Sequence, residues 1–180
     1  MSGQSHHRPL RSFVRREGRL TPGQKRALAT YAPAYGLASD DTQLDLVASF
    51  GRDAPVVMEI GFGDGEALLA MAAAQPEINY LGVEVYRPGI GRLYQGLAER
   101  ELTNVRVIQR DAVDVMKNQL PPAALAGIHV FFPDPWPKKR HHKRRLIQPA
   151  WADLAAQCLR DGGWLHLATD WQDYAEHMLE

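Results

Sequence analysis

The stretch from Val56 to Gly65 reads VVMEIGFGDG, a short apolar run with a β-branched start that ends at three alternating glycines. The residues that follow, 66–75, are rich in alanine and leucine and contain no helix breaker before Pro76. Runs of the first kind favour strands, and runs of the second kind favour helices. This part of the sequence therefore predicts a strand, a tight turn and a helix.

The same alternation continues along the rest of the chain. Further strands are expected at 80–85, 105–108, 128–132 and 164–168, and helices at 91–101, 111–117, 149–161 and 172–180. Strands separated by helices form right-handed βαβ units with parallel strands. The expected fold class is α/β, with a doubly wound, mostly parallel sheet.

Length and composition limit the class of protein. The 180 residues, 45% hydrophobic, suffice for one globular domain, and we expect Trp151 and Trp164 in its core. The apolar runs are far shorter than the roughly 20 residues of a membrane helix, and residues 1–30 lack the apolar region of a secretion signal. The lone Cys158 cannot form an intramolecular disulfide, and no Cys/His spacing indicates a metal site. The expectation is a cytoplasmic protein with no membrane contact and no metal.

The formal net charge of +0 hides a separation of charge along the chain. Residues 1–30 carry seven basic and one acidic side chain, and residues 138–145 carry six basic and no acidic ones. Residues 40–84 carry nine acidic side chains and one basic one. Such a distribution indicates a surface for polyanions. Residues 1–39 are expected to be a mobile basic arm with one helical turn after Thr21, and residues 40–180 the folded domain.

The three glycines Gly61, Gly63 and Gly65 let the backbone turn sharply and approach a ligand beside the N-terminus of the next helix. A dinucleotide fingerprint would need its third glycine at position 66, which is Glu66. Glu59, at the end of the strand, would repel phosphates and attract an ammonium group. The loop therefore favours a nucleoside cofactor without a pyrophosphate over a nicotinamide dinucleotide; the alternative is a glycine-rich surface turn without a ligand.

Two more carboxylates are expected at the same edge of the sheet. Glu84 ends the second strand, where a carboxylate can accept both hydroxyls of a ribose. Asp111, followed by Ala112, ends the third strand, where an adenine amino group would lie. Each acid alone could be a helix cap or a solvated loop residue. Together with Glu59, their common position at strand ends indicates a cofactor site.

Residues 131–138 read FFPDPWPK and follow the fourth strand. Prolines on both sides of Asp134 restrict its backbone, and Trp136 offers a flat face for stacking a base. The cations beyond them suit contacts with phosphates, although a proline-stiffened loop with a solvated basic tail is the alternative. Asp170, after the fifth strand, is either a second carboxylate on this rim or a helix N-cap.

These segments together resemble the bacterial tRNA (guanine-N7)-methyltransferases. The resemblance extends over residues 11–175 and is carried by RSFVRREGRLT at 11–21, EIGFGDG at 59–65, GVEVY at 82–86, RDA at 110–112, PDPWPKKRHHKRR at 133–145 and ATDW at 168–171. It implies a Rossmann-like, class I fold that uses S-adenosylmethionine, and methylation of a variable-loop guanosine in tRNA at N7.

The resemblance also implies roles for individual residues. The implied cofactor-binding residues are Glu59, Gly61, Gly63, Gly65, Glu84, Asp111, Ala112 and Asp134, and Asp134 is also the implied catalytic residue. The implied substrate and RNA contacts are Lys138, Arg140, His141, His142, Lys143, Arg144, Arg145 and Asp170. The expected partner is tRNA, without a metal, and the protein is expected to be a monomer or weak homodimer. Family members continue through two more strands and a Thr-x-x-Glu motif, which we expect to be missing here.

Two other functions stay open at this point. In an exocyclic-amino methyltransferase, an acidic or amide residue is followed by Pro-Pro-aromatic, which is similar to Asp134-Pro135-Trp136. In this sequence the second proline follows the aromatic residue instead of preceding it. A non-catalytic RNA-binding protein could use the same basic segments but would not bind S-adenosylmethionine.

Overall fold

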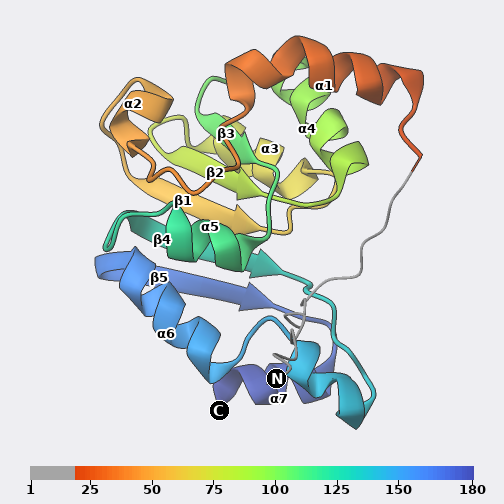
Figure 1. Ribbon diagram of the computed structural model, residues 1–180, viewed down its shortest axis with the longest axis vertical. Helices are drawn as coiled ribbons and strands as arrows, with labels where there is room; N and C mark the ends of the chain where they lie inside the picture. The colour runs from red at the N-terminus through yellow and green to blue at the C-terminus, as the bar shows by residue number, and fades with distance from the viewer. Residues whose placement is uncertain (1–18) are drawn as a thin grey trace, which may run out of the picture.

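The computed structural model describes residues 19–180, which are built around a sheet of five parallel strands (Figure 1). The strands are β1 (Val56–Ile60), β2 (Asn79–Val83), β3 (Val105–Ile108), β4 (Leu125–Phe131) and β5 (Leu159–Ala168). Their order across the sheet is β3-β2-β1-β4-β5. The expected doubly wound α/β fold is confirmed. The strand order reverses between β1 and β4, and open sheets of this kind bind ligands beyond the strand ends at that point.

Helices cover both faces of the sheet. One face carries α1 (Pro22–Tyr35), α3 (Glu66–Ala74) and α4 (Arg87–Glu99). The other face carries α2 (Leu46–Phe50), α5 (Ala112–Asn118), α6 (Pro149–Cys158) and α7 (Gln172–Leu179). A short 3-10 helix, η1 (Lys139–Arg144), lies between β4 and α6.

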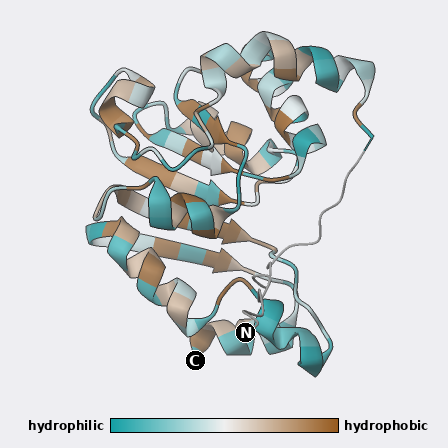
Figure 2. Cartoon of the chain, viewed as in Figure 1, coloured by the Kyte–Doolittle hydropathy of each residue, from teal (hydrophilic) through white to brown (hydrophobic). Residues whose placement is uncertain are grey.

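Alternating side chains of the strands fill two apolar clusters. Met58 of β1 packs on the side of α5, α6 and α7, where Trp151 is buried as predicted. Its neighbour Val57 packs on the opposite side, against α3 and α4. Figure 2 shows hydrophobic residues concentrated along the strands. Because Glu59 shares its face with Val57, its carboxylate belongs to the side of α3 and α4.

The helix α1 differs from the expected arm with a single helical turn. Thr21 and Gln24 cap it reciprocally, with N···O distances of 3.2 and 2.9 Å. Ala27 is buried, and α1 packs along α4. Residues 22–35 of the predicted arm thus form a helix that packs on the folded domain. The rest of that prediction, for residues 1–18, lies outside the described residues.

The prediction that Trp164 belongs to the core is wrong, since its side chain is 43% exposed. Trp164 lies on β5, the edge strand, and its indole packs across Gly127 of β4, where an added Cβ would lie 2.5 Å from the ring. The indole of Trp164 is thus covered on one side by the sheet, and it is not enclosed between the sheet and a helix. Over residues 19–180, no helix is long and apolar enough to cross a membrane.

Candidate active site

Glu59 lies at the end of β1 and is 3% exposed. Its Oε2 atom has no hydrogen-bond partner within residues 19–180. Burial, and secondly the charge of Glu84, raises the pKa of Glu59 to about 7. A buried polar atom without a partner is unfavourable. This carboxylate therefore fits a ligand that brings its own donor, such as an ammonium group.

The glycine loop that follows Glu59 has open space on one side. Gly61 and Gly63 have φ angles of 71° and 58°, and an added Cβ at either position would meet nothing within 4 Å. The loop is supported from the other side by α4, because an added Cβ at Gly89 would lie 2.0 Å from the carbonyl oxygen of Gly63. A ligand can thus approach the backbone of the loop closely on its open side.

Glu84 fastens the end of β2 to this loop. Its Oε2 accepts a hydrogen bond from the N–H of Gly63 (2.9 Å), and its Oε1 accepts from Val85 (2.6 Å) and Tyr86 (2.9 Å). A carboxylate offers about four acceptor positions. The predicted ribose-binding carboxylate therefore has most of its capacity used by the protein backbone and keeps room for a further donor.

Asp111 and Asp134 follow the next two strands. Asp111 is the N-cap of α5, and its Oδ1 accepts from the N–H of Val113 at 2.9 Å. Asp134 is half-buried in a loop that turns sharply, since Phe132 and Trp136 on either side have φ angles of 50° and 45°. The structure therefore brings the ends of β1, β2, β3 and β4, each with a carboxylate, to one edge of the sheet.

The basic run after Asp134 forms η1. Lys138, Lys139, Arg140 and Lys143 are exposed, whereas the guanidinium of Arg144 lies over the ring of Trp136 at 5.0 Å from its centroid. His141 approaches the same ring edge-on, with 5.8 Å between ring centroids. This segment therefore presents a group of cations to solvent beside the strand ends.

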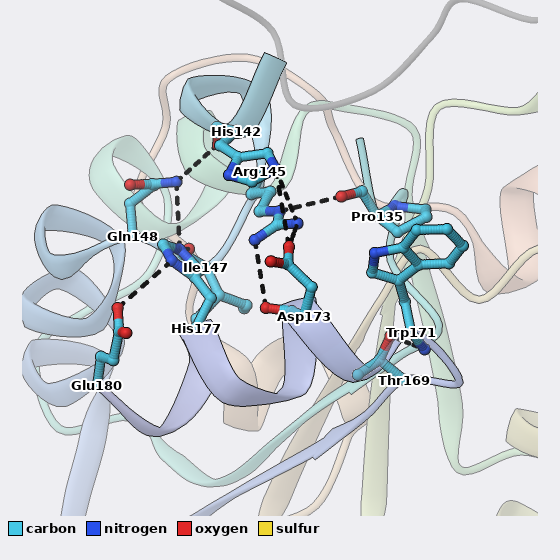
Figure 3. A network of polar contacts seen from close by, with 10 residues as sticks. All are labelled: Pro135, His142, Arg145, Ile147, Gln148, Thr169, Trp171, Asp173, His177 and Glu180. Atoms are coloured by element: carbon cyan, nitrogen blue, oxygen red, sulfur yellow. Dashed lines mark hydrogen bonds and ion pairs between the residues drawn. The ribbon is translucent and has the colours of Figure 1, made fainter. Parts of the chain in front are cut away.

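Arg145 does not share that exposure. Its side chain is 1% exposed, forms an ion pair with Asp173 of α7, and donates from Nε to the carbonyl oxygen of Pro135 at 3.0 Å (Figure 3). Its guanidinium also lies over the ring of Tyr174, 4.7 Å from the centroid. The position of Arg145 does not support the expected RNA contact, since its guanidinium is turned inward and connects the loop to α7.

Asp170 remains on the rim, and the structure does not use it as a cap. The residue is exposed, and the N-cap position of α7 is Trp171, which makes no side-chain capping bond. The N–H of Trp171 donates to Oγ1 of Thr169 at 3.2 Å. The side chain of Asp170 is thus placed where a substrate could reach it.

His129 of β4 is a site residue that the sequence did not single out. It is the register partner of Glu59 on β1 and of His166 on β5, so the three side chains share one face of the sheet. Its Nδ1 atom is buried and lacks a partner within the described chain, and burial, followed by the charge of His166, lowers its pKa to about 4. The position of His129 in an apolar strand next to Val130 was a usable signal, because neighbouring strand residues point to opposite faces of the sheet.

The sequence of the chain is similar to those of known methyltransferases. Residues 53–180 match a family model described as "Putative methyltransferase". A tRNA (guanine-N(7)-)-methyltransferase of Alkalilimnicola ehrlichii is 58% identical over 175 residues, which cover 96% of this chain and 74% of that protein. A protein of the same name from Nitrosospira multiformis is 55% identical over 180 residues, which cover 100% and 79% respectively.

Solved structures support the fold. An antibiotic-related methyltransferase has a TM-score of 0.55 at 15% identity, covering 79% of this chain and 73% of the other. A 30S ribosomal A1408 methyltransferase from an uncultured bacterium has a TM-score of 0.53 at 13% identity, covering 77% and 65%. The arrangement of the described strands and helices is thus that of Rossmann-like methyltransferases.

Proposed function

The chain belongs to the tRNA (guanine-N(7)-)-methyltransferase family, and from this premise we propose that it transfers a methyl group from S-adenosylmethionine to N7 of a variable-loop guanosine in tRNA. The observation that carries the proposal for the cofactor is that Oε2 of Glu59, just before the open glycine loop, has no hydrogen-bond partner among the residues that the structure describes. S-adenosylmethionine has an ammonium group but no phosphate, so it suits this carboxylate where a dinucleotide would be repelled.

The neighbouring acids suit the remaining polar groups of the cofactor. We assign the ribose hydroxyls to the free acceptor position of Glu84 and the adenine amino group to Asp111 beside Ala112. Gly61, Gly63 and Gly65 form the backbone against which the cofactor lies. Asp134 would contact the cofactor from the end of β4. When bound, S-adenosylmethionine supplies an electrophilic methyl group on a sulfonium sulfur.

Guanine N7 carries its lone pair in the plane of the ring, so the base can attack the methyl carbon without losing a proton first. The cofactor, which Glu59, Glu84 and Asp111 would hold, would supply the methyl carbon, and the electron pair of its carbon–sulfur bond would stay on sulfur as the bond to N7 forms. The protein therefore needs no strong general base, and its task is to align the reactants and stabilise the cation that develops on the base. We assign this electrostatic role to the carboxylate of Asp134.

The tRNA would bind along η1 and the rim of the strand ends. Exposed Lys138, Arg140 and Lys143 suit phosphate oxygens, with His141, His142 and Arg144 beside them. Asp170, on the same rim, is proposed to contact the substrate. Since tRNA is the proposed substrate, we place the activity in the cytoplasm.

The test is transfer of labelled methyl from S-adenosylmethionine to an unmodified tRNA transcript, followed by nuclease digestion and identification of the labelled nucleoside. We expect label in 7-methylguanosine. A transcript in which the variable-loop guanosine is replaced by adenosine is the matched control and should take up no label. Label in N6-methyladenosine would replace the proposal by the exocyclic-amino reaction, and binding of tRNA without any binding of S-adenosylmethionine would favour a non-catalytic RNA-binding protein.

A further inference from the structure

An exposed aromatic ring stands at the end of β4, two residues before Asp134. The side chain of Phe132 is 67% exposed. Its position is fixed nonetheless, because its N–H donates to the carbonyl oxygen of Ala168, the last residue of β5, at 2.8 Å. Burying a phenylalanine ring is favourable. Packing within residues 19–180 therefore gives no reason for an aromatic side chain at this position.

The backbone gives no reason for it either. Phe132 has a φ angle of 50°, in the left-handed region where a side chain with a Cβ is disfavoured and a bulky one is an outlier. Glycine or asparagine would adopt this conformation more readily. A residue that is both strained and exposed beside a candidate active site points to a role in binding.

The other aromatic candidate of this loop is already engaged. Trp136, to which the sequence assigned base stacking, has the guanidinium of Arg144 over its ring and His141 at its edge. A second exposed ring lies at the end of the neighbouring strand, where Trp171 is 41% exposed and follows Asp170. Exposed aromatic residues thus stand at the ends of β4 and β5, next to the cations of η1.

We propose that Phe132 is the stacking platform for the guanine that receives the methyl group, with Trp171 as a second aromatic face on the rim. This inference rests on the proposed function. Proteins that recognise single bases in RNA loops separate these bases from their stacked neighbours and stack them on aromatic side chains instead. The base becomes cationic as N7 is methylated, and an aromatic face attracts a cation, so the stack strengthens toward the transition state.

The experiment separates strain from function with substitutions at two positions. In Phe132→Gly the strain is relieved and the ring is lost, and Phe132→Leu removes the ring but keeps an apolar side chain. Ala123→Gly is the matched control, because Ala123 also has a positive φ (54°) and is exposed. Ala123 precedes β4 and so lies at the opposite ends of the strands from the candidate active site. The measurements are the melting temperature, kcat/KM for tRNA methylation and the Kd of S-adenosylmethionine.

We expect Phe132→Gly to melt at or above the wild-type temperature while kcat/KM for tRNA falls about 10- to 100-fold, the size of one lost base stack. Phe132→Leu should lose a similar factor, and both should keep the wild-type Kd for S-adenosylmethionine. Ala123→Gly should raise the melting temperature and keep full activity. Full activity of Phe132→Gly, or a loss of affinity for S-adenosylmethionine as large as the loss in kcat/KM, would overturn the stacking role of Phe132 and leave the proposed function intact. A wild-type chain that does not methylate tRNA would overturn the proposed function and this inference with it.

Discussion

Arg145, the last cation of the basic run, is buried and ion-paired with Asp173 in the first turn of α7. The pair, together with the bond from Arg145 to the carbonyl of Pro135, connects both ends of the loop to α7. A single run of charge thus contains two kinds of cation: several that solvent reaches and one that supports the loop from within.

This division predicts opposite effects for two alanine substitutions. Arg145→Ala should lower the free energy of unfolding by about 2 kcal/mol, because it removes buried hydrogen bonds and ring contacts. It should leave the salt dependence of tRNA binding unchanged. Lys143→Ala should leave stability unchanged and reduce the slope of log K against log salt by about 0.7 to 0.9. Urea denaturation and binding titrations at several salt concentrations measure both quantities.

The control for this pair of substitutions is Arg160→Ala. Arg160 is exposed and lies at the start of β5, at the opposite ends of the strands from the basic run. It should change neither stability nor the salt slope. If Arg145→Ala reduced the slope as much as Lys143→Ala does, the assignment of Arg145 to loop support would be wrong.

Asp134 is expected to act on turnover more than on cofactor binding. Replacing it by alanine removes the negative charge proposed to stabilise the developing cation on guanine, and loss of such a fixed charge lowers kcat by about 100-fold or more. The Kd of S-adenosylmethionine should rise by a much smaller factor. Single-turnover methylation and equilibrium cofactor binding on the same variant give the two numbers, and equal losses would contradict the catalytic assignment.

Most of the sheet could be predicted from local patterns, and so could the common position of several carboxylates at the ends of its strands. Glu59 lies in the last part of β1, and Glu84 and Asp111 follow β2 and β3, which are short and apolar, so their common position follows from the parallel topology alone. Element ends were harder to place. The strand β5 begins at Leu159, and Gly162 and Gly163, which the sequence predicts at the end of a helix, lie where its register with β4 shifts between Leu159 and Trp164. Gly162 has a φ angle of 74°, which glycine adopts readily in such an irregularity.

What could not be predicted depends on contacts between distant segments. The burial of Arg145 requires α7 to lie beneath its loop, and no feature of the basic run distinguishes it from the neighbouring Arg144. The exposed ring of Phe132 was indistinguishable from a strand residue, because it extends an apolar run whose end is set by the turn around Asp134. Both residues needed the fold before their roles could be separated.

The raised pKa of Glu59 predicts a pH dependence of cofactor binding. Below pH 7 the carboxyl is protonated and loses its attraction for an ammonium group, so the affinity for S-adenosylmethionine should rise as the pH increases from 6 to 8. Glu59→Gln should bind more weakly and lose this rise. Isothermal titration at each pH measures both proteins. An unchanged pH dependence in the variant would show that another group, such as the amine of the ligand, is responsible.

The same shift has a consequence for the ligand-free protein. A carboxyl whose pKa is higher when folded than when unfolded contributes a stability that is complete below pH 4.5 and is lost as the pH rises to about 7. The loss amounts to about 3 kcal/mol. The melting temperature of Glu59→Gln minus that of the wild type should therefore increase as the pH rises from 4.5 to 8. A constant difference across this range would contradict the burial of a charged Glu59.

The contact between Gly89 and the carbonyl of Gly63 predicts that the glycine loop depends on a residue outside it. In Gly89→Ala the new methyl group would lie 2.0 Å from that oxygen, so either the loop or the start of α4 must move. We expect a loss of about 1 to 3 kcal/mol in stability from the overpacking, and a larger loss in affinity for S-adenosylmethionine, because the displaced loop forms its site. Gly23→Ala in α1 is the control, since its nearest neighbour is a flexible glutamine side chain at 3.4 Å. Gly23→Ala should be at least as stable as wild type and should bind the cofactor with wild-type affinity. Wild-type cofactor affinity in Gly89→Ala would contradict the prediction, because it would show that the loop tolerates the displacement.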